Sequence, residues 1–220
     1  MDHITSHNWK LLLLAGALVG LMAWPGTSEA QTVTGQAQAA QATVLGMTTA
    51  LADTGTLSDS SDARDATMIT VSVQSLLTGE VLHAVTIGFP DEVDSEASLG
   101  NLALTVGGNG ISADFVMARA QAVLNAASAG MSNIGGLLIN GVPVVVTGDP
   151  NQTISLLGGQ MVINEQQTDP SGTITVNALH VTVNGVADVV VASAKAGITS
   201  STGSTSGGSG GTLPLLPSLF

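Results

Sequence analysis

The chain of 220 residues contains no cysteine and no tyrosine, and aromatic residues make up only 2% of it. Without cysteine, the protein gains no stability from disulfides and offers no thiolate chemistry. With so few aromatic residues, its core must be built from aliphatic side chains. Val, Ile, Leu and Ala pack well between closely apposed sheets, because β-branched side chains suit a pleated strand. The composition therefore favours an all-β protein.

Basic residues are also rare, with four Lys and Arg against sixteen Asp and Glu, for a formal net charge of −12. Binding to nucleic acid needs a cluster of Lys or Arg that neutralises phosphates. Beyond the N-terminal segment only Arg64, Arg119 and Lys195 remain. The charge therefore excludes nucleic acid as a partner, and leaves an acidic solubilising surface or a loose Ca²⁺ site as alternatives.

The first thirty residues are typical of an export signal. A polar start with Lys10 leads into the apolar run Leu11–Trp24, then a Pro25-Gly26 break and the small residues of Ser28-Glu29-Ala30. This pattern predicts a signal peptide over residues 1–30 with cleavage near Ala30. The alternative is a membrane anchor, but the apolar run is shorter than the roughly 20 residues that a spanning helix needs. We therefore expect a protein that is secreted or held at the cell surface, with no membrane span in the mature chain.

Residues 31–198 alternate apolar and polar side chains between turn residues, which is the pattern of half-buried strands. In residues 172–183 the alternation places Ile174, Val176, Ala178 and His180 on one face. The Ala-rich segment 117–129 continues such an alternation, and we expect a strand there that ends in a loop or a short helix. Further strands are expected over residues 66–74, 80–87, 102–106, 111–117, 153–157 and 161–164.

Turn residues separate these strands. Asn-Gly takes the positive φ of a tight hairpin turn readily, so residues 109–110, 140–141 and 184–185 are expected to be hairpin turns. Pro143 cannot donate a ladder hydrogen bond and should mark an edge or a bulge. Residues 53–65 and 90–96 are expected to be acidic loops.

The fold predicted from these features is all-β, a two-layer β-sandwich with hairpin connections, with a β-solenoid or β-roll as the alternative. One exported domain is expected over residues 31–198. Residues 199–220 form a tail that is rich in Gly, Ser and Thr and ends in a short apolar segment. Its composition is typical of a flexible linker.

His83 and His180 are the only histidines beyond the signal, and each lies within a strand pattern. Neutral imidazole is a common metal ligand, but no His-x-His or His-Glu-x-x-His spacing is present. We therefore interpret them as partly buried histidines whose ring nitrogens bond to backbone or to a neighbouring polar group.

The two acidic loops offer Ca²⁺ candidates, since this cation takes several carboxylate and carbonyl oxygens. Neither loop has the regular spacing of a calcium-binding loop. The alternative is a pair of solvated turns in which Asp and Ser bond to their own backbone. The candidate ligands are Asp59, Asp62, Asp65, Asp91 and Asp94.

No catalytic signature is present. The chain has no Gly-x-Ser-x-Gly elbow and few histidines to serve as a base. A glycosidase would need two carboxylates across a cleft and usually aromatic side chains, which this chain lacks. We therefore expect no enzyme activity, no catalytic residues and no cofactor other than Ca²⁺, with a secreted hydrolase as the alternative.

Several short segments share a further pattern, namely Ile139–Val144, Thr147–Thr153, Val162–Gln166, Asn177–Val181, Asp188–Val190 and Ala192-Ser193. Together these segments resemble the choice-of-anchor P family of bacterial exported proteins. The resemblance covers roughly residues 36–198 and implies a bacterial exported or surface protein whose relatives differ in their C-terminal sorting tails. The family brings no established catalytic residue or ligand.

The tail departs from this family pattern. It contains no Leu-Pro-x-Thr-Gly signal, no Pro-Glu-Pro motif and no final hydrophobic span with a basic flank. We expect either a truncated tail or a released protein. The function predicted is that of a non-enzymatic surface or extracellular-matrix component, structural or adhesive, that contacts the cell envelope, extracellular polysaccharide or another protein. A Ca²⁺-dependent binding module and the hydrolase are the alternatives.

Overall fold

The computed structural model describes residues 30–73 and 76–201, and within them the chain forms thirteen β-strands and no helix. A six-stranded sheet, sheet A, has the order β10-β11-β12-β13-β1-β2. A seven-stranded sheet, sheet B, has the order β3-β4-β5-β6-β8-β9, with β7 also paired to β6. The strands are β1 (Ala30–Val44), β2 (Met47–Asp53), β3 (Ala63–Val73), β4 (Leu77–Gly88), β5 (Glu92–Val106), β6 (Asn109–Val123), β7 (Ala129–Gly135), β8 (Leu138–Ile139), β9 (Val142–Pro143), β10 (Gln152–Leu156), β11 (Gly159–Thr168), β12 (Ile174–Val183) and β13 (Ala187–Ser201).

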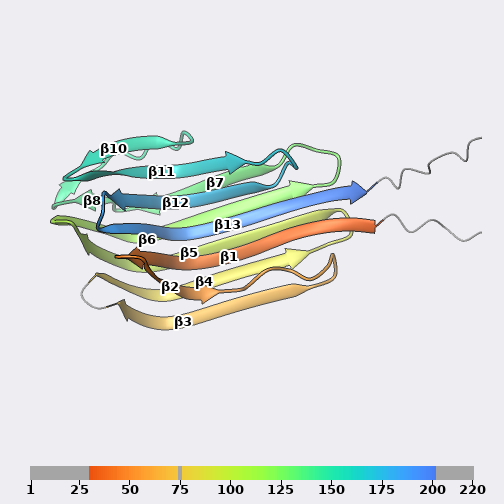
Figure 1. Cartoon of the computed structure of the whole chain (residues 1–220), viewed down its shortest axis with the longest axis horizontal. Helices are drawn as coiled ribbons and strands as arrows, with labels where there is room; N and C mark the ends of the chain where they lie inside the picture. The colour runs from red at the N-terminus through yellow and green to blue at the C-terminus, as the bar shows by residue number, and fades with distance from the viewer. Residues whose placement is uncertain (1–29, 74–75, 202–220) are drawn as a thin grey trace, which may run out of the picture.

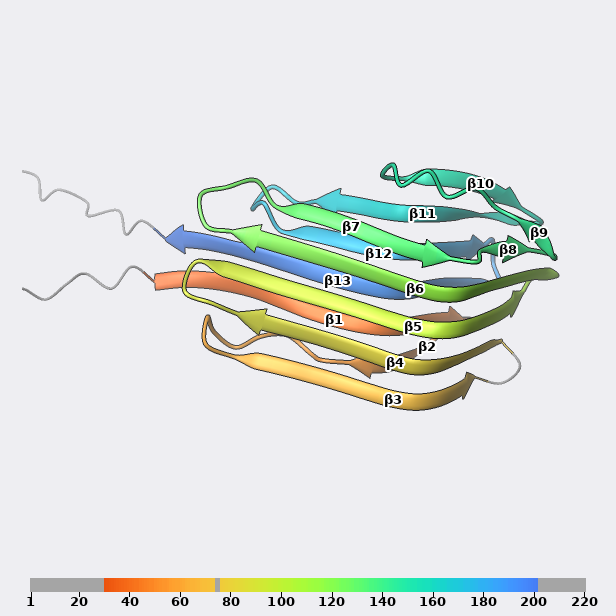
Figure 2. The same cartoon turned by 180° about the vertical axis from the view of Figure 1, so that it is seen from behind.

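The two sheets stack face to face, so the predicted two-layer β-sandwich is confirmed (Figure 1). All strand pairs are antiparallel, and most neighbours in a sheet are joined directly by a turn. The two sheets are packed layers, not the successive coils of a β-solenoid. Figure 2 shows sheet B from its outer side, with β3 at one margin and β9 and β10 at the other.

The core between the sheets is aliphatic, as the composition predicts. Its largest fully buried side chains are Leu, Ile, Val and one Met, Met161, and many small Ala side chains lie between them. The aromatic side chains Phe89 and Phe115 lie outside it, with exposed fractions of 42% and 40%. Each buried Leu, Ile or Val stabilises the fold by about 1.5–3 kcal/mol. The many aliphatic side chains on the inner faces of the two sheets therefore supply the hydrophobic stabilisation that larger aromatic side chains supply in other proteins.

Sheet A is bent along a line that crosses its strands. At this line four strands bury adjacent residues, which breaks the simple alternation, and in β1 the preceding Ala37 and Gln38 are buried as well. The pairs are Ala39-Ala40 in β1, Ile163-Asn164 in β11, Ala178-Leu179 in β12 and Val191-Ala192 in β13. Every second strand from β11 to β2 has a left-handed residue there, namely Asn164, Ala192 and Ala52, with φ of 51°, 53° and 46°. Because non-glycine residues rarely adopt this conformation, the bend is a built feature of the sheet.

Sheet B is bent at a matching level. Here two consecutive residues lie on the outer side of the strand, Glu80-Val81 in β4 and Asp114-Phe115 in β6. Val81 and Asn101 have φ of 49° and 48°. In sheet A the two consecutive residues at the bend both face the core, and in sheet B they both face outward. The two sheets therefore bend in the same direction and stay packed against each other. Beyond the bend, the long strands that cross it present the opposite set of side chains from the one that simple alternation predicts.

The first and last described strands pair along their whole length, from Ala30 opposite Ser201 to Val44 opposite Ala187. Both ends of the domain therefore leave at the same end of the sandwich (Figure 1). β13 continues to Ser201, past the domain boundary expected at residue 198. The predicted signal, apart from Ala30, and the tail from residue 202 lie outside the described residues. Within the described part of the chain, no helix is available to cross a membrane.

Several turn predictions can be compared directly. Asn140-Gly141 is a two-residue hairpin turn with both φ values positive, as predicted. The prediction for residues 109–110 is wrong, because the turn is Gly107-Gly108, and Asn109 is a buried residue of β6. Residues 184–185 do lie in the β12–β13 turn, which includes Val186 as well. Pro143 lies in β9, at the edge of sheet B, as expected.

Two loop predictions need correction. Residues 92–96 are not a loop, because β5 begins at Glu92 and alternates buried Val93 and Ser95 with outward Asp94 and Glu96. The clustering of acidic residues concealed this period of two. The loop expected over residues 53–65 is confined to residues 54–62, since β3 begins at Ala63. The strand expected from residue 117 runs to Val123 and then ends in a loop, as predicted.

Candidate functional site

The bend in sheet A determines where His180 lies. Alternation from Ile174 places this side chain with the buried residues, but two consecutive residues, Ala178 and Leu179, are buried, and His180 then faces outward. The prediction that His180 shares a face with Ala178 is therefore wrong. His83 also faces outward, from β4 in the other sheet, between buried Leu82 and Ala84. The two histidines lie on opposite outer faces of the sandwich and share no pocket.

On the outer face of sheet A, His180 is the centre of a chain of polar contacts that we call the His180 network. Its Nδ1 lies 2.8 Å from Glu165 Oε2, and its Nε2 lies 3.3 Å from each carboxylate oxygen of Asp188. The network continues as Asn177 Nδ2 donates to Glu165 Oε2 at 2.6 Å and Ser193 Oγ donates to Asn177 Oδ1 at 2.7 Å. Adjacent strands β11, β12 and β13 therefore supply a fixed polar strip.

The geometry of this strip defines what it can do. A protonated imidazole donates from both nitrogens, so it would satisfy Glu165 and Asp188 at once, whereas a neutral ring donates to only one of them. Ser193, the hydroxyl in the network, donates to Asn177 and has no contact with the imidazole. The arrangement thus orders charges on an open sheet face and does not pair a nucleophile with a base in the way that acyl transfer requires.

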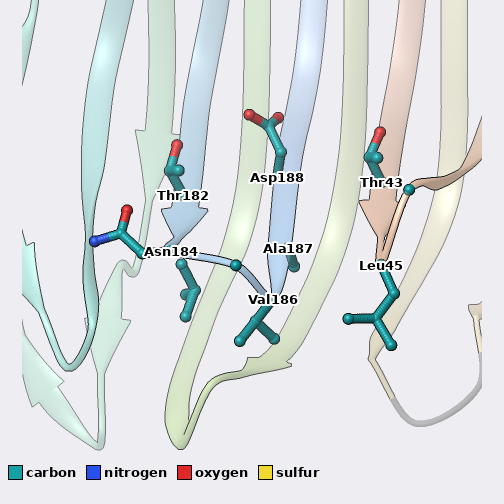
Figure 3. Close-up of a pocket in the computed structure, with 10 residues that line it drawn as sticks. Thr43, Leu45, Thr182, Asn184, Val186, Ala187 and Asp188 are labelled. Carbon is teal, nitrogen blue, oxygen red and sulfur yellow. The ribbon is translucent and has the colours of Figure 1, made fainter.

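Beside the network, at the far end of the sandwich from the chain ends, lies a shallow hollow of about 430 Å³. Figure 3 shows Thr43, Thr182 and Asp188 on the strands, with Leu45 and Val186 in the turns beyond them. The two turns are held together by a hydrogen bond from Leu45 N to Val186 O at 3.2 Å. Leu45 is 80% exposed and Val186 is 41% exposed. We call this feature the tip hollow, a polar floor with an apolar rim.

Two of the Ca²⁺ candidates of the first acidic loop, Asp59 and Asp62, accept hydrogen bonds from neighbouring residues of the chain. Asp62 Oδ2 accepts from the backbone N and Oγ of Ser58 and from Arg64 Nε, all within 2.9 Å. The Ser58 and Arg64 hydrogen bonds lower the pKa of Asp62 from 3.8 to about 2. Asp59 accepts from the N and Oγ of Ser61, and these bonds lower its pKa as well. Asp65 is an exposed residue of β3.

The other two candidates lie near the turn between β4 and β5. Asp91 is exposed in that turn, and Asp94 forms an ion pair with Arg119 at 3.1 Å. The turn and the first loop meet at the same end of sheet B, because Gly88 N donates to Asp62 O at 2.9 Å. Across residues 30–73 and 76–201, however, no three His, Asp or Glu side chains converge in a way that could hold a metal ion.

The residues of the His180 network other than His180 itself were not singled out by the sequence pattern. A usable signal was present in β1 and β12, since each has two adjacent apolar residues where alternation predicts one. These pairs are Ala39-Ala40 and Ala178-Leu179, whereas in β13 residues 189–192 are all apolar and mark no single position. The two pairs mark the bend and therefore the reversal that brings His180 to the outer face.

No protein-family model, no curated protein and no solved structure matches this chain. The resemblance to the choice-of-anchor P family therefore stays a prediction that rests on the short segments named above.

Proposed function

We propose that this protein is an exported, non-enzymatic scaffold, a structural or adhesive component of the cell surface or extracellular matrix. The observation that carries the proposal is the pairing of β1 with β13. It brings Ala30 and Ser201 together at one end and leaves the turns of the other end free to meet a partner. A domain tethered through either end of its chain would present the same far end outward.

The far end has the side chains that such a role needs. Leu45, Met47 and Leu157 are exposed by 80%, 77% and 70%. They lie in or beside the β1–β2 and β10–β11 turns, next to the tip hollow. Exposed apolar groups clustered on an otherwise polar surface mark interaction sites. The partner class that fits them is the cell envelope, an extracellular polysaccharide or another surface protein.

The non-enzymatic part of the proposal is supported by the His180 network, in which the available hydroxyl is bonded away from the imidazole. The acidic surface adds a second argument. Once the signal is removed, only three basic side chains are left among the many acidic ones, so the protein would stay dispersed by charge and bind through its apolar tip.

Export and tethering are tested by fractionating producing cells into cytoplasm, envelope and medium, with mass spectrometry of both termini of the protein. We expect the mature chain to begin near Gln31 and to be found in the envelope or the medium. A chain that keeps Met1 and stays in the cytoplasm would contradict the proposal.

Adhesion through the tip is tested by binding the purified protein to an isolated envelope fraction. The variant carrying both Leu45→Ser and Met47→Ser should lose most of its binding. Val145→Ser is the matched control, because Val145 is also 80% exposed but does not line the tip hollow. Equal loss in both variants would show that the tip is not the contact surface.

A further inference from the structure

β3 is an edge strand of unusual length for this molecule. Among residues 30–73 and 76–201 it pairs only with β4, and it extends over 11 residues, Ala63–Val73, so one side of its backbone has no strand of this described part beside it. The other edges within the described residues are shorter or obstructed, and β2, the edge of sheet A on the same margin, has seven residues. β9 has two residues and contains Pro143, β10 has five, and the Gly130 carbonyl of β7 accepts a hydrogen bond from Gln166 of sheet A.

Apart from the bend and the charged pair Arg64-Asp65 at its start, the sequence of β3 contains none of the usual residues that protect an edge. It has no Pro, no Gly and no Lys, and from Ala66 to Val73 it has no charge. Proteins normally block exposed edges with such residues, because an open edge pairs with another strand. Ile69 is 80% exposed and Met68 is 36% exposed, which places apolar side chains at the middle of the open edge.

The bend of sheet B gives this edge a particular shape. Ala66 and Met68 lie opposite buried residues of β4, and so do Val71 and Val73. The residues of β3 that face the core therefore have even numbers up to Met68 and odd numbers from Val71 onward. A straight, regular strand paired with β3 could have its inward and outward side chains in step with those of β3 on one side of the bend only.

We propose that β3 pairs antiparallel with β3 of a second copy of this chain across a two-fold axis between Ile69 and Thr70. In this register Met68 lies opposite the partner's Val71, both facing inward, and Thr67 lies opposite the partner's Ser72, both facing outward. The change from even to odd numbers is what makes the register consistent. The two bends coincide on the axis, and two copies of sheet B become one continuous bent sheet.

Charge supports a second copy as the partner. The whole chain has a formal net charge of −12, so two copies repel each other over most of their surfaces. The β3 edge is neutral, because Arg64 and Asp65 are its only charged residues. In the proposed register they lie beyond the partner's Val73, far from the partner's Arg64 and the partner's Asp65, so no like charges meet. Facing hydroxyl residues and facing apolar residues in such pairs stabilise a sheet.

An apolar groove lies along the same margin of the sandwich, between β2 and the end of β3. It has a volume of about 720 Å³, and its lining includes Leu51, Val73 and Leu76, with Leu45 and Met47 of the tip also lining it. A second copy placed along β3 would lie beside the Val73 and Leu76 part of this groove and add apolar burial to the backbone hydrogen bonds. The proposed pairing does not depend on export or adhesion.

The test is the mass of the purified protein, measured by light scattering after size exclusion across a dilution series. We expect a species of twice the chain mass that dissociates on dilution. Ile69→Lys should remain monomeric throughout the series, because the charge lies on the axis, where the two copies would place two lysines together. Val145→Lys is the matched control, since Val145 is equally exposed, and it should dimerise like the native protein.

Because the chain has no cysteine, a single cysteine gives a second readout. Under mild oxidation Ile69→Cys should form a disulfide-linked dimer, and Val145→Cys should not. Thermal melting of each variant confirms that the fold is kept. A native protein that is monomeric at every concentration, an Ile69→Lys variant that still dimerises, or equal cross-linking at both positions would overturn the proposal.

Discussion

The two long margins of the sandwich differ in how the edges of the two sheets are joined. At one margin, which we call the closed side, sheet A ends in β10 and β11 and sheet B ends in β7, β8 and β9 (Figure 2). At the other margin, the open side, β2 faces β3. Polar side chains connect the two sheets on the closed side, whereas an apolar groove separates the strand edges on the open side.

The closed side depends on amide side chains. Asn109 of β6 is 1% exposed, and it both donates to Leu157 O and accepts from Leu157 N, at 3.0 Å each. At the other end of this margin, Gln166 Nε2 donates to Gly130 O at 3.0 Å. A side-chain amide has a donor and an acceptor, so it can replace a missing strand neighbour. These bonds fix both the spacing and the register of the two sheets.

The open side has no such bond between β2 and β3 within the described residues. The described side chains that line the groove there, among them Leu51 and Val73, are mostly apolar and form no hydrogen bond with one another. Apolar contact sets no unique register, so this margin tolerates a new neighbour. Two sheets that share one aliphatic core can therefore be joined by hydrogen bonds at one margin and remain available for association at the other.

Removing Asn109 should have the largest effect on this difference. Asn109→Ala leaves both polar groups of Leu157 without their partners, and we expect a loss of about 2–3 kcal/mol in the free energy of unfolding. Urea unfolding measures it. Asn133→Ala is the control, because Asn133 is exposed on β7 of the same margin, and it should change stability by less than about 0.5 kcal/mol. Equal effects would show that the closed side does not depend on the amide.

Gly130→Ala should have a smaller effect on the same side. A Cβ at Gly130 would lie 2.3 Å from Val176 Cγ2 in the buried core, so the two sheets must shift apart. We expect a loss of about 1–2 kcal/mol from this crowding. Gly79→Ala is the matched control on β4, where the nearest atom to the new Cβ, Leu99 Cδ1, is at 3.4 Å and in ordinary contact. A thermal melt that ranks Gly79→Ala as the more damaging change would contradict this account.

The smallest effect concerns the loop that leads from β2 to β3 on the open side. In this loop the Asp62 carboxylate accepts hydrogen bonds from Ser58 and Arg64, and these bonds lower the pKa of Asp62 from 3.8 to about 2. A lowered pKa in the folded state means that the ionised carboxylate stabilises the fold above 3.8, and that this contribution is lost as the pH falls through about 2. The melting temperatures of the native protein and Asp62→Asn should therefore converge over this range.

An NMR titration of the Asp62 carboxyl carbon checks the cause directly. Ser58→Ala removes the hydroxyl donor and keeps the backbone donor, so the pKa of Asp62 should rise part of the way toward 3.8. An unchanged titration in this variant would show that the hydroxyl plays no part.

Much of the fold could be predicted from local patterns, because alternation and turn residues act over a few positions. The sandwich, the hairpin at Asn140-Gly141 and the edge position of Pro143 are of this kind. The facing of His180 could not be predicted by alternation, because the bend that reverses it is shared by neighbouring strands. The role of Asn109 was missed because its partner, Leu157, is far away in the sequence and in the other sheet.

An aliphatic core, a predominance of strands and an acidic surface all follow from composition or from a period of two residues, so the sequence was enough to predict them. The side chains that face outward beyond the bend, the margin joined by amide side chains and the open edge became known from the folded protein. These properties depend on pairing between strands that are far apart in the sequence. A bend in one strand can persist only if its neighbours bend with it, and the β3 edge is open because no other strand of the described residues pairs with it.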